Sequence, residues 1–379
     1  MPFAAALSQH PVPATAVGEV VGQVLEQLGP APDLAVVFVT PPHAGALEDA
    51  AAAIADVLRP GTVIGCAAVS VVGTAREVER SAGVSLWAGR FGPVEPVRLT
   101  AGREGNELTV AGWPESLPFE PSALLLLADP FSFPVQALYE DLASRHPGLR
   151  VLGGNASAAA GPGGNRLVLD RSVHTSGAVG AVLGPGVEVD SVVSQGCRPI
   201  GRPYIVTRAE RNYVLELAGS PALERLVQMT SDGMTEEEID LIDRGLHLGQ
   251  VIDERKLDFE RGDFLVRNVL GADQANGAIA VDDLVPVGAT VQFHVRDAAT
   301  ADEDLRQLLA GREADAALVF TCNGRGMHLF GTPDHDAKVL DERVGVPAAG
   351  FFAAGEFGPV GGRNFVHGFT ASIALFRDA

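Results

Sequence analysis

The chain has 379 residues, and its 28 Lys and Arg against 48 Asp and Glu give a formal net charge of −20 at pH 7. Binding along a nucleic-acid backbone or an anionic membrane needs a basic surface, and no Lys- or Arg-rich run is present to form one. Hydrophobic residues make up 46% of the chain, which supplies packed cores and excludes disorder over most of the length. Because the length exceeds the roughly 100 to 200 residues of a typical domain, two domains are expected.

The cysteine, histidine and apolar patterns exclude several further classes. Cys66, Cys197 and Cys322 lie far apart in the sequence, which excludes a disulfide framework and a CxxC metal site. The nine histidines show no HExxH-type spacing, and the glycine-rich stretch 153–165 matches no nucleotide fingerprint, so we expect neither a metal nor a cofactor. No positively charged leader or membrane-length apolar run is present. A cytoplasmic protein with no nucleic acid and no membrane partner is expected.

Three segments of the chain share one layout of strand, helix, glycine-containing strand and closing strand. Their strands are continuous apolar runs, which is typical of strands buried on both faces of a sheet. We therefore predict an α/β fold of two domains, built on mixed, largely buried sheets with covering helices and weak internal strand-helix-strand-strand repeats. The predicted elements are 35–40, 47–58, 63–68 and 83–88 in the first segment; 123–128, 134–145, 151–156 and 177–182 in the second; and 317–322, an irregular or helical stretch, 349–354 and 371–376 in the third.

Further elements are predicted between the second and third segments. Alternating apolar and polar residues indicate half-buried strands at 264–270 and 291–296. Ser220 and Pro221 favour the start of a helix that runs to Met229. Thr300 has capping-box spacing to Glu303 and predicts the start of another helix. An acidic front predicts a further, exposed helix at 235–246 that connects two domains. We place the division near residues 220–230, which gives domains 1–225 and 226–379.

The segment from Thr321 to Gly326 follows a strongly apolar strand, where α/β proteins commonly place groups that contact ligands. Arg325 offers a planar cationic fork for a carboxylate or phosphate; alternatively, it pairs with a neighbouring acid across a turn. Cys322 is either a nucleophile or a small buried apolar residue. Asn323 lies between them in the sequence.

Glu356 follows the paired strand of the third segment and lies between glycines. Its carboxylate is placed to accept a ligand ammonium group; alternatively, it caps a turn or pairs with Arg325 or Arg363. Further polar candidates extend this cluster or form its counterpart in the N-terminal half. They are Asn364, His367, Arg198 and Asn155, with Cys66 as a neighbour of the last two.

At these residues the chain resembles the FIST family, an intracellular sensory module with an N-terminal and a C-terminal domain. The resemblance covers most of the chain. It implies that the protein senses a small molecule, with amino acids proposed for the family, and it places polar ligand contacts at Cys322, Asn323, Arg325, Glu356, Asn364 and His367. The motifs that carry it are Val63-Ile-Gly-Cys66, Gly153-Gly-Asn-Ala156, Ser194-Gln-Gly-Cys-Arg-Pro-Ile-Gly201, Val266-Arg-Asn268, Gln292-Phe-His-Val-Arg-Asp297, Phe320-Thr-Cys-Asn-Gly-Arg-Gly326 and Gly350-Phe-Phe-Ala-Ala-Gly-Glu-Phe-Gly-Pro359.

The leading hypothesis is a cytoplasmic sensor that binds an amino acid or a related small carboxylate, with Arg325 on the carboxylate and Glu356 on the ammonium group. Nothing beyond two sensory domains is left for an output segment, so an unknown signalling partner or a change of oligomer is expected to carry the signal. One alternative is an enzyme that uses Cys322 in acyl or amide chemistry. Another is an interaction scaffold whose apolar runs form a homodimer surface.

Overall fold

The computed structural model describes residues 2–105, 107–231 and 233–378, and the chain forms two compact units. One unit combines Met1–Val193 with Leu305–Ala379, and the other is Ser194–Asp304. The fold is mixed α/β, as predicted. The predicted division between residues 225 and 226 lies inside the second unit, because the chain leaves the first unit after Val193 and returns to it at Leu305.

The three predicted repeats are present in the first unit, and each contains a β-hairpin, not predicted from the sequence, before its closing strand. The first repeat is β2 (Leu34–Val39), η1 (Pro41–Ala46), α2 (Leu47–Val57), β3 (Thr62–Ala67), the hairpin β4 (Ser70–Gly73) and β5 (Arg76–Glu79), and β6 (Val84–Gly89). The second is β9 (Ala123–Ala128), α3 (Val135–Arg145), β10 (Arg150–Asn155), the hairpin β11 (Leu167–Leu169) and β12 (Ser172–His174), and β13 (Ala178–Leu183). The third is β22 (Ala316–Cys322), α7 (Met327–Phe330), α8 (His335–Arg343), β23 (Ala348–Ala353), the hairpin β24 (Glu356–Val360) and β25 (Arg363–His367), and β26 (Thr370–Asp378).

Each repeat builds its own sheet, and the three sheets have the same strand order. The closing strand lies beside the first strand, the first beside the second, and the second beside a hairpin from another repeat. Hairpin β4–β5 of the first repeat pairs with β23 of the third, β11–β12 of the second pairs with β3 of the first, and β24–β25 of the third pairs with β10 of the second. The flanking strands on the closing side are β1 (Phe3–Ser8), β7 (Val94–Glu104) with β8 (Glu107–Ala111), and β14 (Val187–Gln195).

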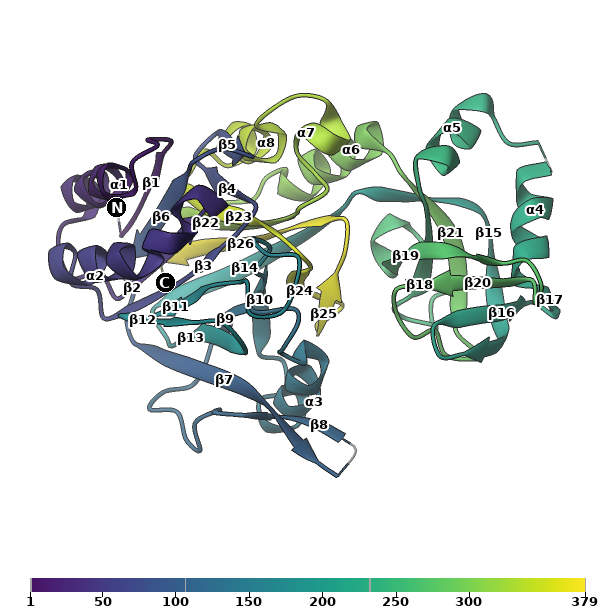
Figure 1. Cartoon of the computed structure of the whole chain (residues 1–379), viewed down its shortest axis with the longest axis horizontal. Helices are drawn as coiled ribbons and strands as arrows, with labels where there is room; N and C mark the ends of the chain where they lie inside the picture. Colours follow the sequence, from purple (N-terminus) through teal and green to yellow (C-terminus); the bar gives the residue numbers. More distant parts are fainter. Residues whose placement is uncertain (1, 106, 232, 379) are drawn as a thin grey trace. The chain divides into compact units, whose positions relative to one another are not determined.

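This cyclic exchange of hairpins gives the first unit an internal pseudo-threefold arrangement. A strand edge that would be open in one repeat is paired by the hairpin of the next, which protects the edge from pairing with other chains. The exchange also means that each sheet is completed only when residues from two repeats meet. In Figure 1, the yellow hairpin β24–β25 accordingly lies beside the blue-green strand β10.

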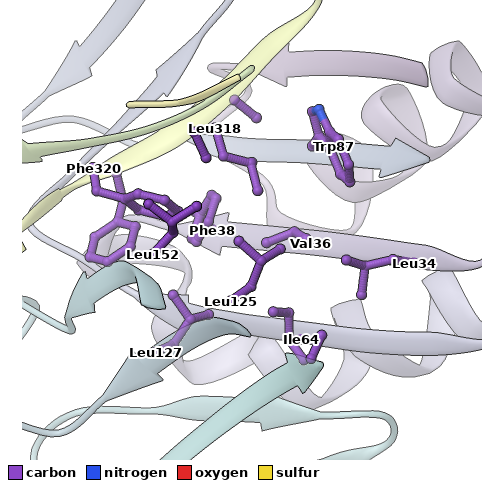
Figure 2. Close-up of a cluster of buried hydrophobic side chains, with 14 of the residues drawn as sticks. Leu34, Val36, Phe38, Ile64, Trp87, Leu125, Leu127, Leu152, Leu318 and Phe320 are labelled. Atoms are coloured by element: carbon purple, nitrogen blue, oxygen red, sulfur yellow. The ribbon is translucent and has the colours of Figure 1, made fainter. Parts of the chain in front are cut away.

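The three sheets enclose a common apolar core. Alternate residues of each first strand enter this core, and corresponding positions carry similar side chains: Val36, Leu125 and Leu318 at one level, and Phe38, Leu127 and Phe320 at the next. Figure 2 shows these side chains together with Leu34, Ile64, Trp87 and Leu152. Burial on both faces explains why the strands read as continuous apolar runs.

A glycine at the same position in each second strand allows close contact with the first strand. The glycines are Gly65, Gly153 and Gly350. A Cβ atom at these glycines would lie 2.3, 1.9 and 1.9 Å from a carbonyl oxygen of the neighbouring strand. Any side chain there would collide with backbone, so these positions require glycine.

Helices cover the outer faces of the three sheets. Helix α1 (Pro13–Leu28) packs beside α2 over the first sheet (Figure 1), α3 covers the second, and α8 with the end of α6 (Ala298–Leu309) covers the third. Across the described ranges, no helix combines the length and apolar character needed to cross a membrane.

The second unit is a closed ring of strands around its own apolar core. The predicted strands at 264–270 and 291–296 are confirmed as β19 and β21. The ring runs through β15 (Cys197–Glu210), β21 (Thr290–Arg296), β18 (Leu246–Val251), β19 (Phe264–Asp273), β20 (Ala278–Val281) and β16 (Tyr213–Leu217), which pairs back with β15. The unit also contains β17 (Ser220–Pro221), α4 (Ala222–Ser231), α5 (Glu236–Arg244) and η2 (Arg261–Asp263).

The helix predictions for this unit were largely correct. Helix α4 begins at Ala222, directly after the predicted start, and α5 carries a capping box between Thr235 and Glu238. The predicted start at Thr300 was wrong, because α6 begins at Ala298. The Asp297 carboxylate accepts the backbone N–H groups of Ala299 and Thr300 at 3.1 and 3.4 Å, which is the contact of an N-cap residue.

Candidate functional site

The ends of β10, β22 and β23 meet at one edge of the first unit. The N–H of Asn323 donates to the Ala353 carbonyl at 2.9 Å, and the N–H of Ala354 donates to the Asn155 carbonyl at 3.0 Å. The N–H of Asn155 in turn donates to the carbonyl of Gly355 at 2.9 Å. Predicted site residues from the second and third repeats are therefore brought to the same edge.

Ser157, just beyond β10, connects this edge to the first repeat. Its Oγ accepts the N–H of Val69 at 3.0 Å and donates to the carbonyl of Phe352. Val69 follows β3, and Phe352 belongs to β23. The ends of the second strands of all three repeats therefore converge at Ser157.

Arg325 is fully buried and forms a two-pronged ion pair with Asp336 at the start of α8. Its Nε and Nη2 donate to the two carboxylate oxygens of Asp336 at 2.7 and 2.8 Å. Thr321 donates to the same carboxylate at 2.6 Å, and His335 Nδ1 lies 2.9 Å from it. Burial by itself would raise the pKa of Asp336, but the charge of Arg325 and these hydrogen bonds hold it well below its usual range.

This ion pair is the second of the two predicted alternatives for Arg325. Nε and Nη2 are the donors in this ion pair. The third guanidinium nitrogen, Nη1, is buried and has no hydrogen-bond partner among the described residues. The ring centroid of Phe330 lies 5.1 Å from the guanidinium carbon, and Phe330 stacks on His335 at 3.4 Å between centroids. Arg325 is thus fixed in position with one donor group still available.

Glu356, the first residue of β24, is also fully buried. Its Oε2 accepts the N–H and the hydroxyl of Thr370 at 3.1 and 2.8 Å. Its Oε1 has no partner within the described part of the chain. Of the predicted alternatives, neither Arg325 nor Arg363 takes these hydrogen bonds. Burial raises the pKa of Glu356 to about 8, although the contacts with Thr370 and the charge of Arg325 oppose the shift.

The internal repeats show how unusual a carboxylate is at this position. Glu356 is paired with Gly154, whereas the corresponding hairpin residues Val71 and Leu167 are paired with Phe351 and Cys66. Val71 and Leu167 belong to the central apolar core. A buried carboxyl group with an unpaired oxygen is unfavourable for folding, and such exceptions to a packing pattern are typical of functional sites.

Cys322 is the last residue of β22, the first strand of the third repeat. Thr40 and Asp129 are the corresponding residues in the other two repeats. Its side chain is 8% exposed, and its Sγ accepts the N–H of Gly324 at 3.5 Å. Burial would lower the pKa of Arg325, but the charge and hydrogen bonds of Asp336, with a smaller contribution from Cys322, raise it. Asn323, the next predicted contact, has an exposed side chain.

Asn155 completes the cluster from the second repeat. Its side chain is 7% exposed, its Nδ2 makes a long contact of 3.5 Å with the Ala354 carbonyl, and its Oδ1 has no partner in the described ranges. We call Asn155, Cys322, Arg325 and Glu356 the strand-end cluster.

Three other predicted residues have structural contacts outside this cluster. Asn364 accepts the N–H of Val151 at 2.9 Å and donates to the Leu149 carbonyl at 2.8 Å, which ties β25 to the start of β10. His367 Nε2 lies 3.0 Å from the Gly358 carbonyl of its own hairpin. Arg198 belongs to the second unit, where it pairs with Asp297 at 3.0 Å and Glu238 at 3.4 Å.

The sequence analysis did not identify Asp336, Thr370 and Glu77. Asp336 is bonded to Arg325, Thr370 is bonded to Glu356, and Glu77 is bonded to the backbone of α8. Glu77 on β5 is buried, and one of its oxygens accepts the N–H of Ala337 at 3.1 Å. Burial and the neighbouring charge of Asp336 raise the pKa of Glu77. Nothing in the sequence pointed to Glu77, because β5 reads Arg-Glu-Val-Glu and holds only one apolar residue. Its contact with Ala337 spans 260 residues and has no sequence signature.

Comparison with known protein families finds two matches along the chain. The FIST N domain matches residues 33–220, and the FIST C domain matches residues 222–359. The chain belongs to the FIST family. FIST domains are sensory domains that have been suggested to bind small ligands. The strand-end cluster of this FIST protein draws Asn155 from the N domain and the other three members from the C domain.

Proteins similar to this chain occur in mycobacteria. The uncharacterized protein Rv0628c of Mycobacterium tuberculosis is 45% identical over 374 residues, 96% of this chain and 96% of its own length. The uncharacterized protein Mb0898c of Mycobacterium bovis is 44% identical over 372 residues, 95% of each chain.

Proposed function

We propose that this FIST protein is a sensor whose small ligand binds at the strand-end cluster. The observation that carries the proposal is that three buried polar atoms of this cluster have no hydrogen-bond partner among the described residues: Nη1 of Arg325, Oε1 of Glu356 and Oδ1 of Asn155. Leaving such atoms unpaired costs about 1–3 kcal/mol each, and native proteins leave few of them. A ligand that satisfies all three would recover that cost on binding.

The chemistry of these atoms favours an amino acid or a related small carboxylate. Nη1 of Arg325 is a permanently charged donor for a carboxylate. Oε1 of Glu356 and Oδ1 of Asn155 are acceptors for an ammonium group once Glu356 is ionised. Charge-assisted hydrogen bonds of this kind fix the orientation of a ligand as well as contributing binding energy.

Signal output through a separate protein and a cytoplasmic location are parts of the same proposal. The mycobacterial relatives are matched over 95–96% of their own lengths. Cys66, Cys197 and Cys322 lie far apart in the sequence, a pattern that fits a reducing compartment. Homodimer formation stays a prediction.

A thermal-shift screen tests the proposal with amino acids, 2-oxo acids and simple carboxylates as probes. A ligand at about 100 times its Kd adds roughly 2.7 kcal/mol to the free energy of unfolding, which raises Tm by several degrees. Glu356→Gln keeps an acceptor for Thr370 but cannot become charged, so it should lose the shift for any amino acid that binds. Glu120→Gln, at an exposed position, is the matched control and should keep it. If a ligand raises the Tm of Glu356→Gln as much as that of the unsubstituted protein, Glu356 does not contact it. If no probe raises Tm, the result counts against a ligand of this class.

A further inference from the structure

The strand-end cluster is closed in this structure. Arg325 and Glu356 are 0% exposed, and Cys322 is 8% exposed. A small molecule can therefore reach these side chains only when a covering segment moves. The contacts of each covering element indicate which segment is held least firmly.

Helix α7 is the cover over Arg325. Its last residue, Phe330, is half-buried and places its ring 5.1 Å from the guanidinium carbon of Arg325. The chain enters α7 directly from the turn in which the N–H of Arg325 donates to the Cys322 carbonyl at 2.8 Å. Moving α7 outward would therefore uncover both Arg325 and Cys322.

The backbone around α7 is suited to hinge motion. The helix has only four residues, and glycines with left-handed φ values flank it: 61° at Gly326 and 68° at Gly331. Glycine adopts such values without the steric cost that other residues incur. None of the four residues of α7 is fully buried, and Met327 is 47% exposed, so the movement gives up mainly the partial burial of Phe330.

One carboxylate anchors the start of α7. Glu79 Oε1, on hairpin strand β5, accepts the N–H of Met327 at 3.0 Å. The same carboxylate fills the space where Gly326 would carry a Cβ, 2.7 Å away. Helix α8 is held more firmly, because Glu77 accepts the N–H of Ala337 and the buried Asp336 is bonded to Arg325 and Thr321.

We propose that α7 is a gate over the strand-end cluster and that Glu79 is the latch that holds it closed. The gate opens about Gly326 and Gly331 and gives access to Cys322 and Arg325. Because Glu79 belongs to the hairpin that the first repeat inserts into the third sheet, the latch also links the gate to the N domain. The inference rests on the proposed function for the ligand that passes the gate, but the opening itself can be measured without a ligand.

The rate of alkylation of Cys322 by iodoacetamide, followed by peptide mass spectrometry on the full-length protein, tests the gate. Glu79→Ala removes the latch and should raise the rate about tenfold, and Phe330→Ala should raise it as well. Glu79→Gln retains an oxygen acceptor and should give an intermediate rate. Glu120→Ala, which removes an exposed carboxylate elsewhere, should leave the rate unchanged. Cys66 and Cys197, both 0% exposed, report unfolding of the first and the second unit, respectively.

The outcomes separate the gate from the proposed function. Faster labelling confined to Cys322 supports the gate, even if no probe in the ligand screen binds. An unchanged Cys322 rate in Glu79→Ala and Phe330→Ala overturns the gate, even if an amino acid binds. Labelling of Cys66 in step with Cys322 would also overturn it, because opening would then be unfolding of the whole first unit.

Discussion

Glu356 and Gly154 are paired across two antiparallel strands that come from different repeats and different FIST domains. The pairing places a buried carboxyl group at a position that is apolar in the other two repeats. The hairpin exchange is therefore both what completes the sheet and what brings the polar groups of the two domains together.

The Glu356→Gln substitution should flatten the pH dependence of stability. The folded state raises the pKa of Glu356 from its usual 4.5 to about 8 through burial, so between these values the native protein holds a proton that the unfolded chain has released. This contribution is fully present below pH 4.5 and is lost as the pH rises through 8, with a slope of up to about 1.4 kcal/mol per pH unit. Urea denaturation of both proteins at intervals from pH 5 to 8 measures the difference. Parallel curves would show that Glu356 ionises normally.

The Arg325–Asp336 pair should show strong coupling in a double-mutant cycle. Arg325→Met leaves the buried Asp336 carboxylate without its cation, and Asp336→Asn leaves the buried guanidinium without its anion. Each single substitution should lower the free energy of unfolding by about 3–5 kcal/mol. The double variant removes both charges and should cost clearly less than the sum, by more than about 1 kcal/mol. Additive losses in denaturant titrations would mean that the ion pair contributes no specific energy.

Gly350→Ala should be severely destabilising, whereas Gly18→Ala should not. A Cβ at Gly350 would lie 1.9 Å from the Val319 carbonyl oxygen, so the first and second strands of the third sheet would have to separate. We expect a loss of at least about 3 kcal/mol. Gly18 lies on an exposed face of α1 with nothing within 4 Å of its Cβ position, and alanine there should add about 0.5–1 kcal/mol. Equal Tm values for the two variants would contradict the proposed strand contact.

The FIST N and FIST C matches meet near residue 221. We expect that cutting the chain there does not give two parts that fold independently. A fragment of residues 222–379 lacks hairpin β4–β5, which pairs with β23, and strand β10, which pairs with β24. It should therefore be poorly folded, while residues 194–304, with their own core, should fold alone. Circular dichroism and cooperative thermal unfolding of the two fragments test this. Cooperative unfolding of 222–379 would show that the hairpin exchange is dispensable.

The sequence alone determined the mixed α/β class, the three repeats, most helices and the polar strand ends, because these follow from local periodicity and from turn residues. It also determined the family, through motifs around Cys322, Arg325 and Glu356. The start of α6 was misplaced because Asp297 and Thr300 both offer cap chemistry, and local sequence cannot rank them.

Only the tertiary structure decided which repeat each hairpin joins and which groups meet. Glu77 reaches Ala337 across 260 residues, and Ser157 joins strand ends from all three repeats. Asp336 neutralises Arg325 from helix α8, in a stretch that the sequence left as helical or irregular. Such contacts depend on the packing of the whole chain, since the pairing of buried charges and strand edges is set by which surfaces come together and not by the residues beside them in sequence.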